Sequence, residues 1–380
     1  MERAASVGDY RALAKARLPH FLFEYLDGGS YAEVTLGRNV ADLEAVALRQ
    51  RVLRDVSAID LSTELFGEPW ALPVGLGPVG LSGLYARRGE VQAARAAATA
   101  EVPFTLSTLS ACSIAEVARD AGAGFWFQLY IVKDRGFVAE MIARAKEAGC
   151  GALLLTVDLA VPGSRYRDYR SGLSGSDGGS RRRLWQSLCR PRWAWDVGVR
   201  GRPHTFGNLE PIAGSDAALQ DLMGWVGSNF DSSVTWKDVE WVRSQWDGPL
   251  IIKGILDPQD ARSAAEAGVD GLVVSNHGGR QLDGVLSTAR ALPKVAEAIG
   301  GRMPVLVDGG VRSGLDVVRM LALGADFVLL GRAWAFALAA AGEEGVAHVL
   351  KIVEAEMRVA MALTGTTRIS DLGSETLGRG

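Results

Sequence analysis

The amino-acid sequence predicts an α/β protein, a (β/α)8 TIM barrel with an N-terminal helical cap and a long insertion after the fourth strand. Four helical patterns end in Ala-Gly or Leu-Gly and lead directly into an apolar run, as a helix does before a buried parallel strand. The spacing of these glycines supports the prediction. Gly122 and Gly149 are 27 residues apart, and Gly268 and Gly324 are 56 apart, which corresponds to one and two strand-plus-helix units of about 28 residues.

The eight strands of the barrel are predicted in order along the chain. They lie at residues 72–76, 103–107, 125–130, 152–157, 249–253, 271–275, 304–308 and 327–330. Proline occurs at or next to the first residue of four of them, where its missing N–H costs no important ladder hydrogen bond. Helical patterns separate the strands, and eight such units close into a parallel barrel. An open doubly wound sheet is the alternative, but no glycine-rich dinucleotide turn follows the first strand.

Composition limits the classes of partner. The chain has 380 residues and a net charge of −3, from 41 Lys and Arg against 44 Asp and Glu. Nucleic-acid binders carry a large basic excess, so we expect no nucleic-acid partner. Cys112, Cys150 and Cys189 are too widely spaced for a metal site or a disulfide framework, which fits a reducing compartment. Because residues 1–4 lack a signal-peptide pattern and charges interrupt the apolar stretch at 314–341, we expect neither export nor a membrane-spanning helix.

We expect one domain over residues 1–380, with a helical cap at residues 1–60 and an inserted loop region at residues 171–232. The insertion follows from spacing, because Gly149 and Gly268 are 119 residues apart, about twice the length of two units. Residues 161–205 also hold ten Arg, three Asp and no Lys or Glu. A Gly- and Ser-rich stretch at 171–180 predicts a mobile loop. Residues 235–246 predict a capped helix that resumes the barrel.

Polar groups at the ends of the last two strands predict a phosphate site. The seventh strand leads into Asp308, Gly309, Gly310, Val311 and Arg312, and the eighth into Gly331 and Arg332. The carboxyl ends of barrel strands converge on one face, and glycine backbone, a following helix start and arginine together suit a phosphate. Two ordinary turns with solvent-exposed arginines are the alternative.

Three other residues at strand ends have chemically competent side chains. His277 lies between Asn276 and two glycines, which suits an exposed, near-neutral base better than a core residue; a turn histidine with structural hydrogen bonds is the alternative. Asp158 ends the fourth strand and is a candidate to orient His277, unless it is simply solvated. Lys253 closes an apolar strand. It is a candidate Schiff-base lysine, a positive charge beside an anionic reduced cofactor, or a lysine that extends from the barrel rim.

Residues 18–29, 127–130 and 275–283 resemble the FMN-dependent L-2-hydroxy-acid oxidase and dehydrogenase family over essentially the whole chain. Within that family, residues 85–94 and 193–198 resemble the bacterial quinone-linked L-lactate dehydrogenases. The resemblance implies FMN as cofactor and no metal. It makes His277 the catalytic base and Lys253 the charge beside the flavin. It also implies a homo-oligomer, a tetramer by analogy with the family.

The resemblance assigns the remaining site residues. The substrate contacts that it implies are Tyr25, Tyr130, Arg165 and Arg280. The FMN contacts that it implies are Pro78, Val79, Gly80, Ser107, Gln128, Thr156, Lys253, Ser275, Asp308, Gly309, Gly310, Val311, Arg312, Gly331 and Arg332. Two positions depart from parts of the family. Leu109 stands where glycolate oxidases carry tryptophan, which leaves the pocket shape and the preferred 2-hydroxy acid open. Gly80 stands where many oxidases carry alanine, as glycine tends to do in the dehydrogenases, and should change the packing around flavin N5.

The implied activity is the oxidation of L-lactate to pyruvate, with electrons passed to a membrane quinone or respiratory chain. His277 fits either removal of the α-proton or removal of the hydroxyl proton with hydride transfer. An oxygen-using 2-hydroxy-acid oxidase is the main alternative. A flavin-free barrel isomerase or aldolase that acts on a phosphorylated substrate is a more remote one.

The insertion predicts peripheral attachment to an anionic membrane surface, on the cytoplasmic face of the inner membrane. Its arginines lie at positions 181–183, 190, 192, 200 and 202. Trp185, Trp193 and Trp195 add aromatic side chains of the kind that favour a membrane interface. The alternative is a solvated arginine loop whose tryptophans pack on the barrel or on a neighbouring subunit.

Overall fold

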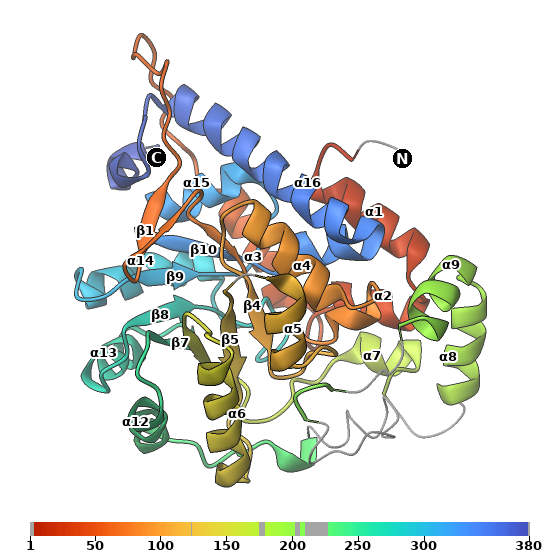
Figure 1. The fold of residues 1–380 in the computed structure, drawn as a ribbon. Helices are drawn as coiled ribbons and strands as arrows, with labels where there is room; N and C mark the ends of the chain where they lie inside the picture. The colour runs from red at the N-terminus through yellow and green to blue at the C-terminus, as the bar shows by residue number, and fades with distance from the viewer. Residues whose placement is uncertain (1–3, 123, 175–178, 202–205, 210–226, 379–380) are drawn as a thin grey trace.

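The computed structural model describes residues 4–122, 124–174, 179–201, 206–209 and 227–378 (Figure 1). Within these ranges, eight parallel strands form one sheet in the order β3-β10-β9-β8-β7-β6-β5-β4. The strands are β3 (Val74–Leu76), β4 (Thr105–Ser107), β5 (Trp126–Leu129), β6 (Leu153–Thr156), β7 (Leu250–Ile255), β8 (Gly271–Val274), β9 (Val305–Val307) and β10 (Phe327–Leu330). A parallel bridge between Leu76 and Phe104 joins the two ends of the sheet. The predicted barrel is confirmed, with every strand inside or close to its expected range.

Helices connect these strands around the outside of the barrel (Figure 1). They are η1 (Ser82–Leu84), α4 (Gly89–Thr99), α5 (Ile114–Ala121), α6 (Arg135–Glu147), α12 (Trp236–Gln245), α13 (Pro258–Glu266), α14 (Thr288–Ile299), α15 (Gly314–Ala322) and α16 (Arg332–Thr364). The glycines that revealed the repeat, Gly122, Gly149, Gly268 and Gly324, have φ between +68° and +107°, a conformation that glycine adopts at little cost. Thr235 forms the expected capping box at the start of α12.

The N-terminal segment forms the helices α1 (Val7–Arg17), α2 (His20–Asp27) and α3 (Val34–Glu44). Residues 45–60, which we expected within the helical cap, form no helix. They run beside the C-terminal tail instead, where Asp60 N–H donates to Thr367 O and Arg49 N–H donates to Thr376 O. That tail holds two short 3-10 turns, η3 (Ile369–Asp371) and η4 (Ser374–Thr376).

A small hairpin closes the amino-terminal end of the barrel. It consists of β1 (Thr63–Leu65) and β2 (Glu68–Trp70), which the sequence analysis did not predict. Leu65, Phe66 and Trp70 pack on barrel side chains that include Trp126 and Phe327. The hairpin therefore covers an apolar surface that would otherwise face water.

The described part of the insertion is mostly helical. It includes α8 (Gly179–Leu188), α9 (Pro191–Trp193) and the π-helical turn η2 (Ala194–Val199), while α7 (Tyr166–Ser171) ends at its first residue. Helices α8 and α9 lie at one side of the molecule in Figure 1. The prediction of a mobile loop at 171–180 is therefore wrong at Ser171, which ends α7, and at residues 179–180, which begin α8. Residues 175–178 lie outside the described residues. Within the described ranges, no helix has the length and apolarity needed to cross a membrane.

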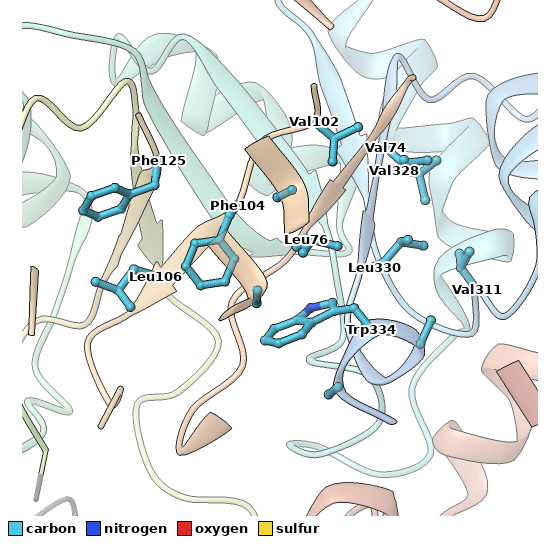
Figure 2. Close-up of a cluster of buried hydrophobic side chains, with 14 of the residues drawn as sticks. Val74, Leu76, Val102, Phe104, Leu106, Phe125, Val311, Val328, Leu330 and Trp334 are labelled. Atoms are coloured by element: carbon cyan, nitrogen blue, oxygen red, sulfur yellow. The ribbon is translucent and has the colours of Figure 1, made fainter. Parts of the chain in front are cut away.

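The interior packing fixes the position of α16, whose first turn borders the carboxyl face of the barrel. Figure 2 shows Trp334 of α16 among apolar side chains that include Leu76 of β3 and Phe104. The Trp334 and Phe104 rings meet edge to face at 6.0 Å, and Trp334 Nε1 donates to Gly77 O at 3.1 Å. Because Trp334 is fully buried, this contact holds the preceding Gly331 and Arg332 at the end of β10.

Candidate active site

A cavity of about 690 Å³ lies at the carboxyl ends of the barrel strands, within the size range of small-molecule sites. All but three of the predicted site residues line it. The three exceptions are Asp158, Gln128 and Ser275, and each of them bonds to a lining residue. The structure therefore brings the whole predicted set together, although it does not by itself assign their roles.

His277 is held in the arrangement of an acid–base group. Its Nδ1 lies 2.8 Å from Asp158 Oδ1 and its Nε2 lies 3.5 Å from the Tyr130 hydroxyl. When Nδ1–H donates to Asp158, the lone pair of Nε2 is left toward the cavity. The backbone φ of His277 is +57°, a strained conformation of the kind found at functional sites. Its N–H donates to Ser275 Oγ at 3.0 Å, which supports that conformation.

The surroundings favour neutral His277 paired with ionised Asp158. Burial lowers the pKa of His277, the charge of Asp158 opposes this shift, and Lys253 adds to it, so that the pKa lies below its ordinary value of 6.5. Burial alone would raise the pKa of Asp158, but His277 and Lys253 hold it below its usual value. A neutral imidazole at neutral pH is the form that accepts a proton.

Arg165 and Arg280 lie over the ring of Tyr25, at 5.6 and 4.7 Å from its centroid. Arg280 Nη1 donates to Tyr25 O at 2.6 Å and to Gly28 O at 3.0 Å. Burial and the charge of Arg280 lower the pKa of Arg165. Its counter-charge is Asp168, 3.8 Å away. Two guanidinium groups on one wall of a cavity form a site for a carboxylate.

The glycines after β9 are required by close packing. Gly309 and Gly310 have φ of +97° and +85°, and a Cβ on Gly310 would lie 2.1 Å from Asn39 O. Arg312 follows them into the cavity, and burial lowers its pKa to about 10. Helix α16 begins at Arg332, directly after Gly331. A glycine turn, a helix start and arginine at one place suit a phosphate.

Arg332 lines the same end of the cavity but is already well bonded. Its guanidinium donates to the carbonyls of Leu26, Gly278 and Gly28 at 3.1, 2.8 and 2.6 Å. Neutral carbonyls leave its charge uncompensated, and burial together with the charge of Arg280 lowers the pKa of Arg332. The contact between Arg332 and a phosphate therefore stays a prediction. Arg332 adds positive charge to the cavity and holds residues 26–28 through their carbonyls.

Lys253 is buried within β7, two residues before its end. Its Nζ lies 3.1 Å from Asp308 Oδ2 and donates to Ser275 Oγ at 2.8 Å. Burial alone would lower the pKa of Lys253, but Asp308 and Asp158 raise it above the usual value. Lys253 is therefore a cation at the wall of the cavity. A protonated lysine is a poor nucleophile, which argues against the Schiff-base alternative.

Unpaired polar atoms near Lys253 test whether a flavin fits. Gln128 Nε2 and Thr156 Oγ1 are buried and make no hydrogen bond to the described residues. Buried donors of this kind are costly unless a ligand pairs with them. An amide, a hydroxyl and a cation, in one cavity with the glycine turn that leads to Arg312, match a polar heteroaromatic ring that carries a phosphate.

Several residues of the cavity had no predicted role. They are Leu26, Tyr85, Leu159, Pro162, Gly163, Ser164, Tyr166, Asp168, Tyr169, Arg170, Ser174, Gly278 and Leu329. Most of them lie on α7 or just before it, beyond the end of a strand, where strand-end reasoning does not reach. Leu109, noted above as a departure from part of the family, also lines the cavity. The space beside Gly80 is bounded by Leu109, since a Cβ on Gly80 would lie 3.5 Å from Leu109 Cβ.

The barrel and its site define a TIM-barrel enzyme with a place for a phosphorylated cofactor beside a His–Asp pair. Comparison with known proteins identifies the family: residues 14–379 match the FMN-dependent dehydrogenase family. The chain belongs to this family, and its cofactor is FMN.

Named relatives and solved structures agree with this assignment. The chain is 62% identical to an L-lactate dehydrogenase of Chromohalobacter salexigens, over 97% of this chain and 94% of the relative. It is also 62% identical to an L-lactate dehydrogenase of Xanthomonas axonopodis pv. citri, over 99% and 96%. A crystal structure of the monotopic membrane protein (S)-mandelate dehydrogenase matches with a TM-score of 0.92, 35% identity and full coverage of both chains. A mandelate oxidase with (S)-4-hydroxymandelic acid matches with a TM-score of 0.86 and 37% identity, over 99% and 98%.

Replacing Asp158 with Asn tests the His277 pair. The active base is neutral, so kcat/KM should rise with pH through the pKa of His277, on the acid side of 6.5. Asp158→Asn removes the charge that raises this pKa, so the acid limb should move to lower pH. The lost orientation of the ring should lower kcat by roughly 10²-fold or more. Steady-state profiles between about pH 5 and 8 measure both effects. Asp55→Asn, at an exposed carboxylate outside the cavity, is the control; an acid limb that moves upward contradicts the assignment.

Replacing Arg312 with Ala tests the phosphate end of the cavity. A charge-assisted bond to phosphate contributes about 1.5–3 kcal/mol, so the FMN dissociation constant should rise roughly 10- to 100-fold. The substrate KM of the FMN-saturated enzyme should change little. Arg319→Ala is the matched control, because Arg319 bonds to Asp316, as the backbone of Arg312 does, but does not line the cavity. Equilibrium dialysis of FMN is the measurement. Unchanged FMN affinity with an altered substrate KM would assign Arg312 to the substrate instead.

Proposed function

We propose that the protein oxidises L-lactate to pyruvate with FMN and passes the electrons to a membrane quinone of a respiratory chain. The observation that carries the proposal is the His277–Asp158 pair in one cavity with two guanidinium groups, in a chain of the FMN-dependent dehydrogenase family. Relatives named L-lactate dehydrogenase, 60–62% identical over nearly the whole chain, support lactate as the substrate.

The proposed chemistry assigns a task to each group. Arg165 and Arg280 bind the lactate carboxylate, and the hydroxyls of Tyr25 and Tyr130 border the reacting carbon. His277 Nε2 takes a proton from the substrate, and Asp158 stabilises the imidazolium that results. Bound FMN supplies the acceptor for the two electrons that lactate loses as it becomes pyruvate and releases two protons.

The flavin contacts are proposed from the same arrangement. Lys253 offsets negative charge at the polar edge of the ring, where Ser107, Gln128, Thr156 and Ser275 supply hydrogen-bonding groups. The residues proposed to border the ring on the β3 side are Pro78, Val79 and Gly80. The residues proposed to hold the phosphate are Asp308, Gly309, Gly310, Val311, Arg312, Gly331 and Arg332.

The choice of a dehydrogenase over an oxygen-using oxidase rests on similarity and on the insertion. The relatives named L-lactate dehydrogenase are 60–62% identical to this chain, whereas the mandelate oxidases of known structure are 37–38% identical. A quinone resides in the bilayer, so an enzyme that reduces it must reach the membrane. A homo-oligomer and the single-domain division of residues 1–380 stay predictions.

We propose that α8 and η2 attach the protein to the cytoplasmic face of the inner membrane. Their exposed apolar side chains are Leu184, Trp185, Leu188, Trp195 and Val199, next to the arginines at 181–183. Such a mixture binds anionic bilayers. The (S)-mandelate dehydrogenase of similar structure is a monotopic membrane protein, which supports the proposal.

One predicted membrane contact is wrong. Trp193 is 6% exposed, and its Nε1 donates to Leu84 O at 2.8 Å, so it packs on the barrel as the alternative interpretation had it. Arg190 is also bonded, through its Nε to Leu18 O at 3.1 Å. Arg202 lies outside the described residues.

Adding L-lactate to the oxidised holoenzyme without oxygen tests the activity. The flavin absorbance should bleach, and a soluble short-chain quinone should restore it much faster than oxygen. His277→Gln should keep FMN but lose reduction by more than the 10²- to 10⁴-fold usual for one acid–base group, since proton removal is the reaction itself. Rapid-mixing absorbance measures each step. Equal rates with oxygen would identify an oxidase, and a protein purified without colour would refute the flavin assignment.

Co-sedimentation with anionic liposomes tests the membrane contact. Wild type should sediment at low salt, while a variant with both Trp185→Ser and Trp195→Ser should stay largely in the supernatant. Lactate oxidation with a soluble dye should be unchanged in that variant, because neither side chain lines the cavity. Salt near 1 M should release the wild type, since the Debye length is then about 3 Å. Leu53→Ser, at a fully exposed leucine outside the insertion, is the control. Equal sedimentation of all variants contradicts the proposal.

A further inference from the structure

Arg167 of α7 is surrounded by three carboxylates that do not line the cavity. Its Nε donates to Glu24 Oε2 at 2.5 Å, its Nη2 to Asp27 Oδ2 at 2.9 Å and its Nη1 to Glu33 Oε1 at 3.4 Å. The Arg167 side chain is only 22% exposed and that of Asp27 only 8%. Ion pairs shielded in this way are screened less by salt than surface pairs are.

This contact joins two segments that are far apart in the sequence. On one side is α7, preceded by Arg165 and containing Asp168. On the other is segment 24–33, which carries Tyr25 and the Gly28 carbonyl that accepts from Arg280 and Arg332. Figure 1 shows α2 and α7 as neighbours. Arg165 directly precedes α7, and Arg280 is bonded to segment 24–33, so the two segments hold the two guanidinium groups of the substrate-carboxylate wall.

The two guanidinium groups of this wall repel each other. Arg165 and Arg280 both lie over the Tyr25 ring, and the charge of Arg280 helps to lower the pKa of Arg165. Arg280 is bonded to segment 24–33 through the carbonyls of Tyr25 and Gly28, so this repulsion acts to separate α7 from that segment. The attraction between Arg167 and three carboxylates acts in the opposite direction, on the same two segments.

We propose that Arg167 is a positioning residue, which holds Arg165 at the separation from Arg280 at which one carboxylate binds both guanidinium groups. The inference rests on the proposed function only in that the substrate is a carboxylate. Arg167 itself does not line the cavity, so it acts through the placement of α7. A small displacement of a binding group is costly, about 10²-fold for 1 Å in favourable cases.

The test compares Arg167→Gln with Arg11→Gln in the FMN-loaded enzyme. Arg11 is the matched control, because it also binds Asp27, through two bonds of 2.6 and 2.8 Å, but reaches it from α1 and not from α7. Arg167→Gln should raise the KM for L-lactate roughly 10- to 100-fold and change kcat much less, because the acid–base pair is untouched. Arg167→Lys should restore part of the affinity. Arg11→Gln should leave both constants near wild type.

Binding of oxalate, followed by the perturbation of the flavin spectrum, separates this proposal from the proposed function. Arg167→Gln should weaken oxalate binding as much as it raises the KM, even if L-lactate proves not to be the substrate. If Arg167→Gln does not fold or loses FMN, Glu24→Gln removes one of the three bonds and should raise the KM by a smaller factor. The proposal is overturned if oxalate binds Arg167→Gln as tightly as wild type, or if Arg11→Gln weakens it equally.

Discussion

The structure depends on holding several positively charged arginine side chains together in one recessed cavity. Arg165, Arg280, Arg312 and Arg332 all line it, and like charges withdrawn from water are costly unless they meet anions or dipoles. The protein supplies carbonyl groups to Arg280 and Arg332 and a carboxylate to Arg165. These partners compensate only part of the charge. A cavity built in this way favours anions, and FMN with its phosphate and a 2-hydroxy acid with its carboxylate both bring negative charge.

The same positive charges help to keep His277 neutral. Lys253 and Arg165 both lower the pKa of His277, in addition to the effect of burial, so the groups proposed to bind cofactor and substrate also keep the imidazole neutral. Asp158 acts in the opposite direction and fixes the ring through Nδ1. Binding and proton removal are therefore linked through one set of charges. Asn276, the residue before His277, is fixed in turn, because its side chain exchanges two hydrogen bonds with that of Asn39 at 2.8 and 2.7 Å.

The sequence was sufficient for those features that local chemistry determines. Apolar runs located all eight strands, and glycines with positive φ marked the helix ends before four of them. The cavity residues at strand ends followed from the convergence of parallel strands. Features that depend on distant partners could not be found. The Asn39–Asn276 pair spans 237 residues. Trp193 lies among arginines, as a membrane-contacting tryptophan often does, but it is buried against the loop after β3. The carbonyl partners of Arg332 belong to α2, the turn that follows it and the loop after β8, and no sequence pattern indicates them.

The insertion has an inner face that packs on the barrel and an outer face that is exposed, and composition alone does not tell the two apart. Its inner face is fixed to the loops that follow β3 and β4. Trp193 bonds to Leu84 O, and Asn208 donates to Ser110 Oγ at 2.9 Å and accepts from Ile114 N–H at 2.8 Å. At the start of those loops, Gly80 after β3 and Ser107 at the end of β4 both line the cavity. The outer face exposes tryptophan and arginine. If the outer face binds a bilayer as proposed, the insertion would lie between the membrane and the loops that follow β3 and β4.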